Sequence, residues 1–227
     1  MDYGSGKCLV FLHGWGGEIA SFRALADKLS ERFRVILIDL YGFGKTPHPD
    51  HPLTIEDYAR GVRGVLDRAE VTDCVPVGHS FGGRIAMRLA ANDPIVSGVV
   101  LLDSAGVIPR RGPRYYGKVA LYKIGKKLKL ASLPKGSADY AALSGVMKKT
   151  FVNVVNESSE PDAMKIRVPT LLIWGSEDED TPLYMCRRLK KRISDSECIV
   201  IEGAGHFAYL EHPEYVRRVL TAFREGI

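Results

Sequence analysis

The most informative stretch of the chain is Val75-Pro76-Val77-Gly78-His79-Ser80-Phe81-Gly82-Gly83, followed by Arg84-Ile85-Ala86-Met87-Arg88-Leu89-Ala90. A short apolar run typical of a strand ends at Gly78, and apolar residues at helical spacing begin after Gly82. Ser80 therefore stands in a G-x-S-x-G pattern on a sharp turn between a strand and a helix. Such a turn strains the serine backbone, and the glycines let strand and helix approach closely. The pattern predicts an exposed serine hydroxyl near the positive end of a helix.

Strand and helix patterns alternate on both sides of this turn. Five further apolar runs are typical of strands, at residues 8–12, 33–38, 99–102, 170–174 and 197–201. Segments with helical spacing lie between or after them, at residues 21–29, 55–69, 183–193 and 213–223. This alternation predicts an α/β fold, with a mainly parallel sheet of about six strands and helices on both faces. Ligands of such folds bind beyond the carboxyl ends of the strands.

Length and composition favour one enzyme-sized domain in the cytoplasm. The 227 residues suffice for a full core, and 45% of them are hydrophobic. No apolar run approaches the roughly 18 residues of a membrane span, and the first residues do not resemble a signal peptide. Four scattered cysteines without C-x-x-C spacing favour core thiols over disulfides. Dispersed histidines and the lack of a nucleotide-binding glycine motif predict neither a metal nor a cofactor.

Five motifs, in this order, resemble those of the α/β-hydrolase fold family. They are His13-Gly14-Trp15-Gly16-Gly17, Asp39-Leu40-Tyr41-Gly42-Phe43-Gly44-Lys45-Thr46, Gly78-His79-Ser80-Phe81-Gly82-Gly83, Trp174-Gly175-Ser176-Glu177-Asp178 with Pro182, and Gly203-Ala204-Gly205-His206-Phe207. The chain is similar to the small single-domain branch of carboxylesterases, meta-cleavage-product hydrolases, haloperoxidase-like enzymes and epoxide hydrolases. The resemblance implies the α/β-hydrolase fold. Because the chain starts at the strand before the first motif, we expect the family's N-terminal hairpin to be missing or vestigial, within residues 2–7.

Three side chains at the ends of strands fit the chemistry of acyl transfer. A serine hydroxyl needs a base that removes its proton, and the base needs a carboxylate that orients it. His206 follows the last strand in a glycine-flanked loop, and Asp178 lies four residues after the strand that ends at Trp174. The order Ser80, Asp178, His206 matches the α/β-hydrolase order. By resemblance, the backbone N–H groups of Trp15 and Phe81 are expected to form an oxyanion hole.

Some residues around these three have other readings. Asp103 ends another strand and is the alternative acid, since some family members place the carboxylate there. A solvated acidic loop is the alternative reading of the segment around Asp178, which also carries Glu177 and Glu179.

Four further residues in the motifs are expected to shape the site without carrying the chemistry. We expect His13, Gly14, His79 and Phe207 to line the substrate pocket or to support it.

The segment 106–162 interrupts the alternation where the family inserts a cap. The core would then be residues 1–105 and 163–227. Between residues 106 and 150 there are eleven Lys or Arg residues, and Asp139 is the only acid, whereas the whole chain carries a net charge of +5. A short, basic helical cap is expected. It would attract an anionic substrate or touch an anionic membrane surface transiently, unless it is simply a solvated helical face. No nucleic-acid-binding motif is present.

The residues and the resemblance together predict a serine hydrolase that cleaves small to medium carboxylic esters through an acyl-serine intermediate. A C–C bond hydrolase of the meta-cleavage type would use the same residues and is the alternative enzyme. A small-molecule-binding protein without catalysis on this fold is the alternative of another class. Epoxide hydrolase chemistry is disfavoured, because those relatives carry aspartate at the position of Ser80. The acyl and alcohol groups and the oligomeric state stay open.

Overall fold

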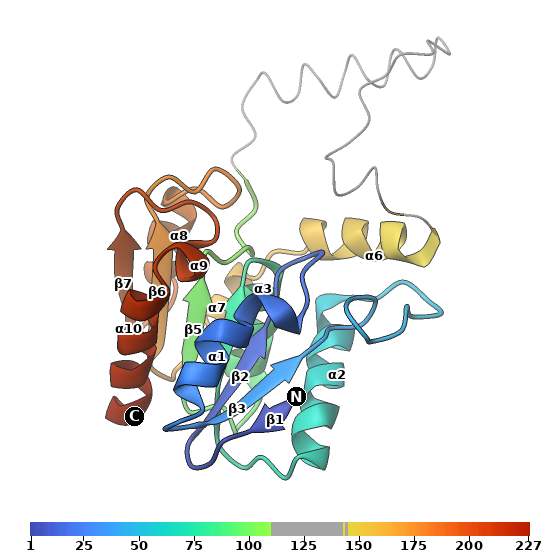
Figure 1. Ribbon diagram of the computed structural model, residues 1–227. Coiled ribbons are helices and arrows are strands. Elements are labelled where there is room, and N and C mark those ends of the chain that lie inside the picture. The colour runs from blue at the N-terminus through green and yellow to red at the C-terminus, as the bar shows by residue number, and fades with distance from the viewer. Residues whose placement is uncertain (110–142, 144) are drawn as a thin grey trace.

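A seven-stranded sheet forms the centre of the computed structural model, which describes residues 1–109, 143 and 145–227 (Figure 1). The strands are β1 (Asp2–Tyr3), β2 (Cys8–Leu12), β3 (Arg34–Ile38), β4 (Cys74–His79), β5 (Val99–Leu102), β6 (Thr170–Gly175) and β7 (Ser196–Ile201). Their order in the sheet is β1-β3-β2-β4-β5-β6-β7. Strands β2 to β7 are parallel, and they correspond to the six runs that the sequence predicts.

The remaining strand, β1, is the vestige of a hairpin at the edge of the sheet beside β3. It pairs antiparallel with β3 through only two residue pairs, Asp2 with Ile36 and Tyr3 with Val35. An ion pair of 2.6 Å between Arg34 and Asp2 lies across the same two strands. Charged side chains on an edge strand discourage pairing with another chain. The expected vestige within residues 2–7 is therefore present.

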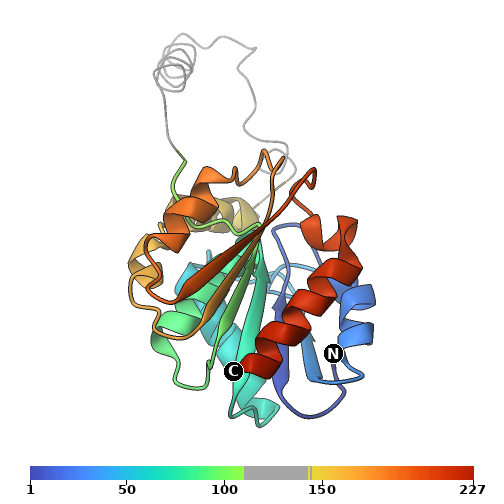
Figure 2. The same ribbon diagram turned by 90° about the vertical axis from the view of Figure 1, so that its left-hand side faces the viewer.

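Helices cover both faces of the sheet, as the alternation predicts (Figure 2). One face carries η1 (Ile19–Phe22), α1 (Arg23–Leu29), α9 (Ala208–Glu211) and α10 (Pro213–Gly226); the other carries α2 (Ile55–Arg68), α3 (Phe81–Asn92) and α8 (Tyr184–Lys190). Strand β2 is apolar throughout because both of its faces are buried: Val10 packs into the core on one face of the sheet and Phe11 into the core on the other. All four cysteines are free thiols, and three of them are buried.

Two helices belong to the segment that interrupts the alternation, α6 (Gly145–Asn156) and α7 (Glu160–Ala163). The parallel strands point toward the end of the molecule at which α6 lies (Figure 1). Most of the expected basic cap, including its charges from Arg110 to Lys135, falls outside the described residues. Within the described part of the chain, no helix is long and apolar enough to cross a membrane.

Arg88 of α3 holds this segment where it returns to the core. Its guanidinium forms ion pairs with Glu56 of α2 at 2.8 Å, Glu157 at 2.7 Å and Asp162 of α7 at 2.8 Å. Burial alone would lower the pKa of Arg88, but the three carboxylates stabilise its charged form and raise that pKa. We call these four residues the Arg88 cluster.

Candidate active site

Ser80 lies on a strained turn between β4 and α3. Its backbone has φ 48° and ψ −111°, a conformation that residues other than glycine rarely adopt. The flanking glycines have a steric reason. A Cβ atom on Gly78 would lie 2.5 Å from the carbonyl oxygen of Gly82, and one on Gly82 would lie 2.0 Å from that of Leu12. Strand and helix can therefore approach this closely only with glycine at both positions, as the G-x-S-x-G pattern predicts.

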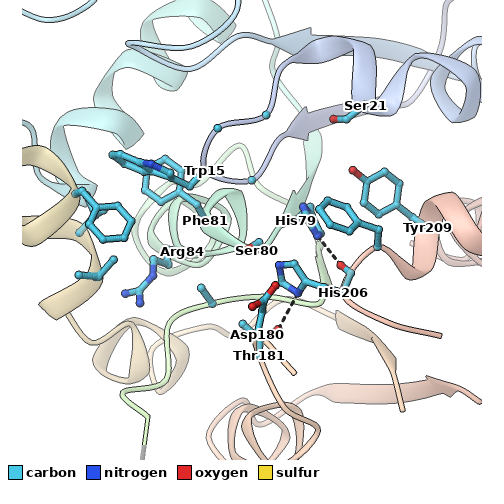
Figure 3. Close-up of a pocket in the computed structure, with 18 residues that line it drawn as sticks. Trp15, Ser21, His79, Ser80, Phe81, Arg84, Asp180, Thr181, His206 and Tyr209 are labelled. Carbon is cyan, nitrogen blue, oxygen red and sulfur yellow. Dashed lines mark hydrogen bonds between the residues drawn. The ribbon is translucent and has the colours of Figure 1, made fainter. Parts of the chain in front are cut away.

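Ser80 lines a pocket of about 460 Å³ at the carboxyl ends of the strands (Figure 3). The loops after β2, β4, β5, β6 and β7 all contribute to its wall, with Trp15, Ser80, Ala105, Thr181 and His206 respectively. Side chains of α6 close the side opposite His206 and Tyr209. The volume is within the range of small-molecule sites, about 300–1,000 Å³.

Asp178 and His206 are joined by a hydrogen bond of 3.0 Å between Oδ2 and Nδ1. Asp178 is held by its own loop, because its Oδ1 accepts the backbone N–H groups of Asp180 and Thr181, both at 2.9 Å. The Thr181 hydroxyl donates to Oδ2 at 2.6 Å. This is an Asx-type turn, in which an aspartate side chain orders the backbone that follows it. The loop is therefore not merely a solvated acidic segment at Asp178.

The electrostatics of the pair keep Asp178 ionised and favour a proton on His206. Burial would raise the pKa of Asp178, but the hydrogen bonds from His206 and Thr181 outweigh it and lower that pKa. Burial likewise would lower the pKa of His206, yet the hydrogen bond with Asp178 and the charge of this carboxylate raise it above its usual value of 6.5. A carboxylate on Nδ1 leaves Nε2 of the neutral ring free to accept a proton.

Ser80 and His206 line the same pocket, and no hydrogen bond joins their side chains within the described residues. Catalytic hydrogen bonds of unliganded enzymes are often long and tighten when substrate binds. The structure thus brings serine and histidine to one pocket.

Asp103, the alternative acid, is fully buried beside this pair and does not bond His206. Its Oδ1 accepts the N–H of Gly175 at 2.8 Å, and its Oδ2 finds no partner among the described residues. Burial raises the pKa of Asp103 to about 7, with the nearby charge of Asp178 acting in the same direction. The geometry favours Asp178 as the partner of His206 and leaves Asp103 to hold the end of β6.

Two further histidines support the site as neutral side chains. Burial lowers the pKa of His79 to about 3, with His206 adding to the effect. The Nε2 of His79 donates to the carbonyl oxygen of His206 at 2.8 Å. Burial also lowers the pKa of His13. The His13 ring accepts the N–H of Leu40 at 3.1 Å and donates to the Gly14 carbonyl at 2.8 Å. Gly14, His79 and Phe207 line the pocket, whereas His13 lies behind it.

Two backbone N–H groups near Ser80 have no hydrogen-bond acceptor among the described residues. Neither the N–H of Trp15 nor that of Phe81 has an acceptor within the part of the chain that the structure describes. Phe81 is the first residue of α3, and the N–H groups of a first helical turn have no intrahelical partner. The Trp15 ring packs edge-on against Phe81 at 5.2 Å and against Phe151 of α6 at 5.0 Å. These contacts hold the loop after β2 against the helix after β4.

The comparisons with known proteins agree with this geometry. The model of the "Alpha/beta hydrolase family" matches residues 9–219. The chain belongs to the alpha/beta hydrolase family. Among curated members, it is 28% identical to the AB hydrolase superfamily protein YisY of Bacillus subtilis, over 98% of this chain and 93% of that protein. It is also 28% identical to a 2-hydroxy-6-oxo-2,4-heptadienoate hydrolase of Pseudomonas putida, over 98% of this chain and 90% of that protein.

One solved structure is similar to this chain in sequence as well as in fold. It is Est816, described as an N-acyl homoserine lactone degrading enzyme, with a TM-score of 0.78 and 28% identity over 98% of this chain and 95% of that one. Family membership supports hydrolase activity for the present chain.

Several residues of the pocket escape the sequence analysis. Thr181 bonds both the Asp178 carboxylate and the carbonyl oxygen of Asp103, the latter at 3.0 Å. The Asp-Thr-Pro sequence after Asp178 is a turn signal that could have indicated it. Arg84 also lines the pocket, and its position four residues after Ser80 places it one helical turn further on the same face. Tyr209 contacts His79 at 5.0 Å between ring centroids and has no such signal.

Proposed function

We propose that this hydrolase cleaves carboxylic esters of small to medium acyl groups through an acyl-serine intermediate. The hydrogen bond of 3.0 Å between Asp178 and His206, in a pocket that also contains Ser80, carries the proposal. A structural serine on a turn would need neither a histidine nor a buried carboxylate beside it. The similarity to Est816 supports ester chemistry, since a lactone is a cyclic ester.

In the proposed reaction, Ser80 attacks the ester carbonyl while Nε2 of His206 takes the hydroxyl proton. Asp178 holds the histidine in the required tautomer and stabilises its protonated form. The amides of Trp15 and Phe81 donate to the negative oxygen of the tetrahedral intermediate, and each such donor typically contributes about 3–4 kcal/mol in the transition state. His206 then donates its proton to the leaving alcohol. Water attacks the acyl-serine in the same manner and releases the acid.

Hydrolysis of a C–C bond beside a ketone is the second candidate. The similarity to the heptadienoate hydrolase of Pseudomonas putida favours it specifically. Serine, histidine and aspartate would have the same roles, with a stabilised carbanion as the leaving group that takes the proton from His206. The two activities differ in the leaving group, so a substrate panel separates them.

The first test is hydrolysis of p-nitrophenyl esters with acyl chains from acetate to decanoate, with Ser80→Ala as the matched inactive control. We expect turnover that depends on Ser80, with an optimum among the shorter chains. Labelling of Ser80 by a fluorophosphonate without ester turnover would favour the C–C hydrolase, to be assayed with a dienoate ketone. If the protein shows no turnover and Ser80 is not labelled, the enzyme hypothesis is refuted and a binding protein is favoured.

A further inference from the structure

Arg84 places an unpaired positive charge in the wall of the pocket. It lies in the first turn of α3, four residues after Ser80, and only 5% of it is exposed. Its side chain runs from α3 toward the end of α6 (Figure 3). Among the described residues that line the pocket it is the only Lys or Arg. Figure 3 shows it between α6 and Ser80.

Within the described part of the chain, the charge of Arg84 forms no ion pair and is offset only through space, by the Glu157 carboxylate. Its Nη1 donates to the backbone carbonyl of Glu157, just past the end of α6. The Glu157 carboxylate itself is bound by Arg88 at 2.7 Å. No carboxylate pairs with Arg84 among the described residues, whereas Arg88, one turn further along the helix, has three. A buried guanidinium without a counter-ion is energetically costly, which an anionic ligand would offset.

Two nitrogens of Arg84 remain as donors. Nε and Nη2 have no partner among the described residues, and neither is sealed from the pocket as a buried orphan atom. Adjacent N–H groups on one edge of a guanidinium match the two oxygens of a carboxylate. Burial lowers the pKa of Arg84 to about 10, so the group is still cationic at neutral pH.

The position of the charge indicates which half of an ester it would meet. His206 must protonate the leaving alcohol, so the alcohol lies on the His206 side of the pocket. Arg84 and α6 lie on the opposite side of Ser80 (Figure 3), which leaves that side for the acyl chain. Asp180 lines the pocket on the side of His206, and its negative charge there disfavours an anionic alcohol. The two halves of the pocket therefore differ in charge.

We infer that Arg84 is a specificity-determining residue that binds a carboxylate at the far end of the acyl chain, so that monoesters of dicarboxylic acids are the preferred substrate class. This inference rests on the proposed ester hydrolysis. The Cα atoms of Ser80 and Arg84 are about 6 Å apart along the helix, which suits acyl chains of only a few carbons between the two carboxyl groups.

The test compares three esters in the full-length enzyme: monoethyl adipate, ethyl hexanoate, and the hexanoyl ester of glycolate. The second is neutral, and the third carries its carboxylate on the alcohol. We expect kcat/KM to be highest for monoethyl adipate. In Arg84→Gln, which keeps a donor for the Glu157 carbonyl, the ratio of monoethyl adipate to ethyl hexanoate should fall about tenfold or more. Arg60→Gln, which removes an exposed positive charge of α2 outside the pocket wall, should leave the ratio unchanged.

A purely structural role for Arg84 predicts a different outcome. If Arg84 only anchors α6, Arg84→Gln lowers the rates for all three esters equally, and the unchanged ratio would overturn the inference. Wild-type preference for the glycolate ester over monoethyl adipate would also overturn it.

A binding measurement separates the inference from the proposed function. Calorimetric titration of monoethyl adipate into the Ser80→Ala protein needs no turnover. We expect binding that weakens about tenfold or more when Arg84→Gln is added. Such binding without any hydrolysis by the wild type would refute the ester function and keep the anion site, whereas hydrolysis of ethyl hexanoate without Arg84-dependent binding would refute the site and keep the function.

Discussion

Replacing Asp178 with asparagine should lower kcat/KM about 10⁴-fold, because it places the wrong tautomer of His206 beside Ser80. The N–H groups of Asp180 and Thr181 both point at Oδ1, at 2.9 Å, so the amide oxygen of the asparagine must stay there. The amide NH₂ then occupies the position of Oδ2, 3.0 Å from Nδ1 of His206. Nδ1 must accept this hydrogen bond, the proton moves to Nε2, and Nε2 can no longer act as the base.

The magnitude corresponds to about 5.5 kcal/mol of lost transition-state stabilisation. Steady-state hydrolysis of a p-nitrophenyl ester measures it, with circular dichroism to show that the variant is folded. Asp103→Asn is the matched control, as it removes a second buried carboxylate of the same site. Its amide oxygen can keep the Gly175 N–H, and its NH₂ takes the place of an oxygen that has no partner among the residues that the structure describes. We expect its kcat/KM within about tenfold of the wild type.

The reverse pattern would refute this reasoning. Near-wild-type activity of Asp178→Asn together with an inactive, folded Asp103→Asn would make Asp103 the acid. Equal losses in both variants would mean that the site responds to total negative charge rather than to the tautomer of His206.

Three further predictions concern pH, packing and strain. The kcat/KM for a neutral ester should fall as the pH drops through a pKa above 6.5, because His206 must be neutral and its pKa is raised; a pH–rate profile with an acid limb below 6.5 would contradict this. Urea unfolding should show that Gly82→Ala lowers the free energy of unfolding by about 3 kcal/mol, since its Cβ would meet a carbonyl oxygen at 2.0 Å. Gly64→Ala in α2 should raise the free energy of unfolding by about 1 kcal/mol, because the space around the new Cβ is open. Similar effects in both variants would disprove the steric account. The free energy of unfolding of Ser80→Gly should be about 1 kcal/mol higher than that of Ser80→Ala, because glycine adopts a φ of 48° without strain. Equal free energies would mean that the turn stores no strain.

Much of the fold was predictable from local patterns. All six parallel strands coincide with the apolar runs within a residue or two. Strands β2 to β6 are buried on both faces and must be apolar throughout, whereas β7, at the edge of the sheet, is partly exposed. Helix ends were less predictable. The pattern predicts a helix over 183–193, but α8 spans Tyr184–Lys190, and the chain continues in turns to Ile193. Apolar spacing does not distinguish the last helical turn from the turns that follow it.

The candidate site was predictable where chemistry is tied to a strand end, as for Asp178 and His206. The position of Arg84 in the pocket wall was not, because it depends on a contact between distant segments, whereas the turn signal after Asp178 could have indicated Thr181. The hydrogen bond of Arg84 to the Glu157 carbonyl joins residues 73 positions apart, and nothing near Arg84 in the sequence indicates where α6 returns. The expected division into core and cap stays a prediction, as most of the cap's basic residues lie outside the described chain.

The Arg88 cluster has a consequence for how substrate range can change in evolution. Glu157 and Asp162, near the end of the segment 106–162, are bound by the same helix whose first turn follows Ser80. The junction is therefore a docking point built into the core, with Glu56 as its third carboxylate. Segments exchanged upstream of this junction would inherit a correctly placed nucleophile. A chimera that exchanges the residues upstream of Glu157 and keeps Arg88 with its three carboxylates is therefore expected to fold around an unchanged nucleophile turn.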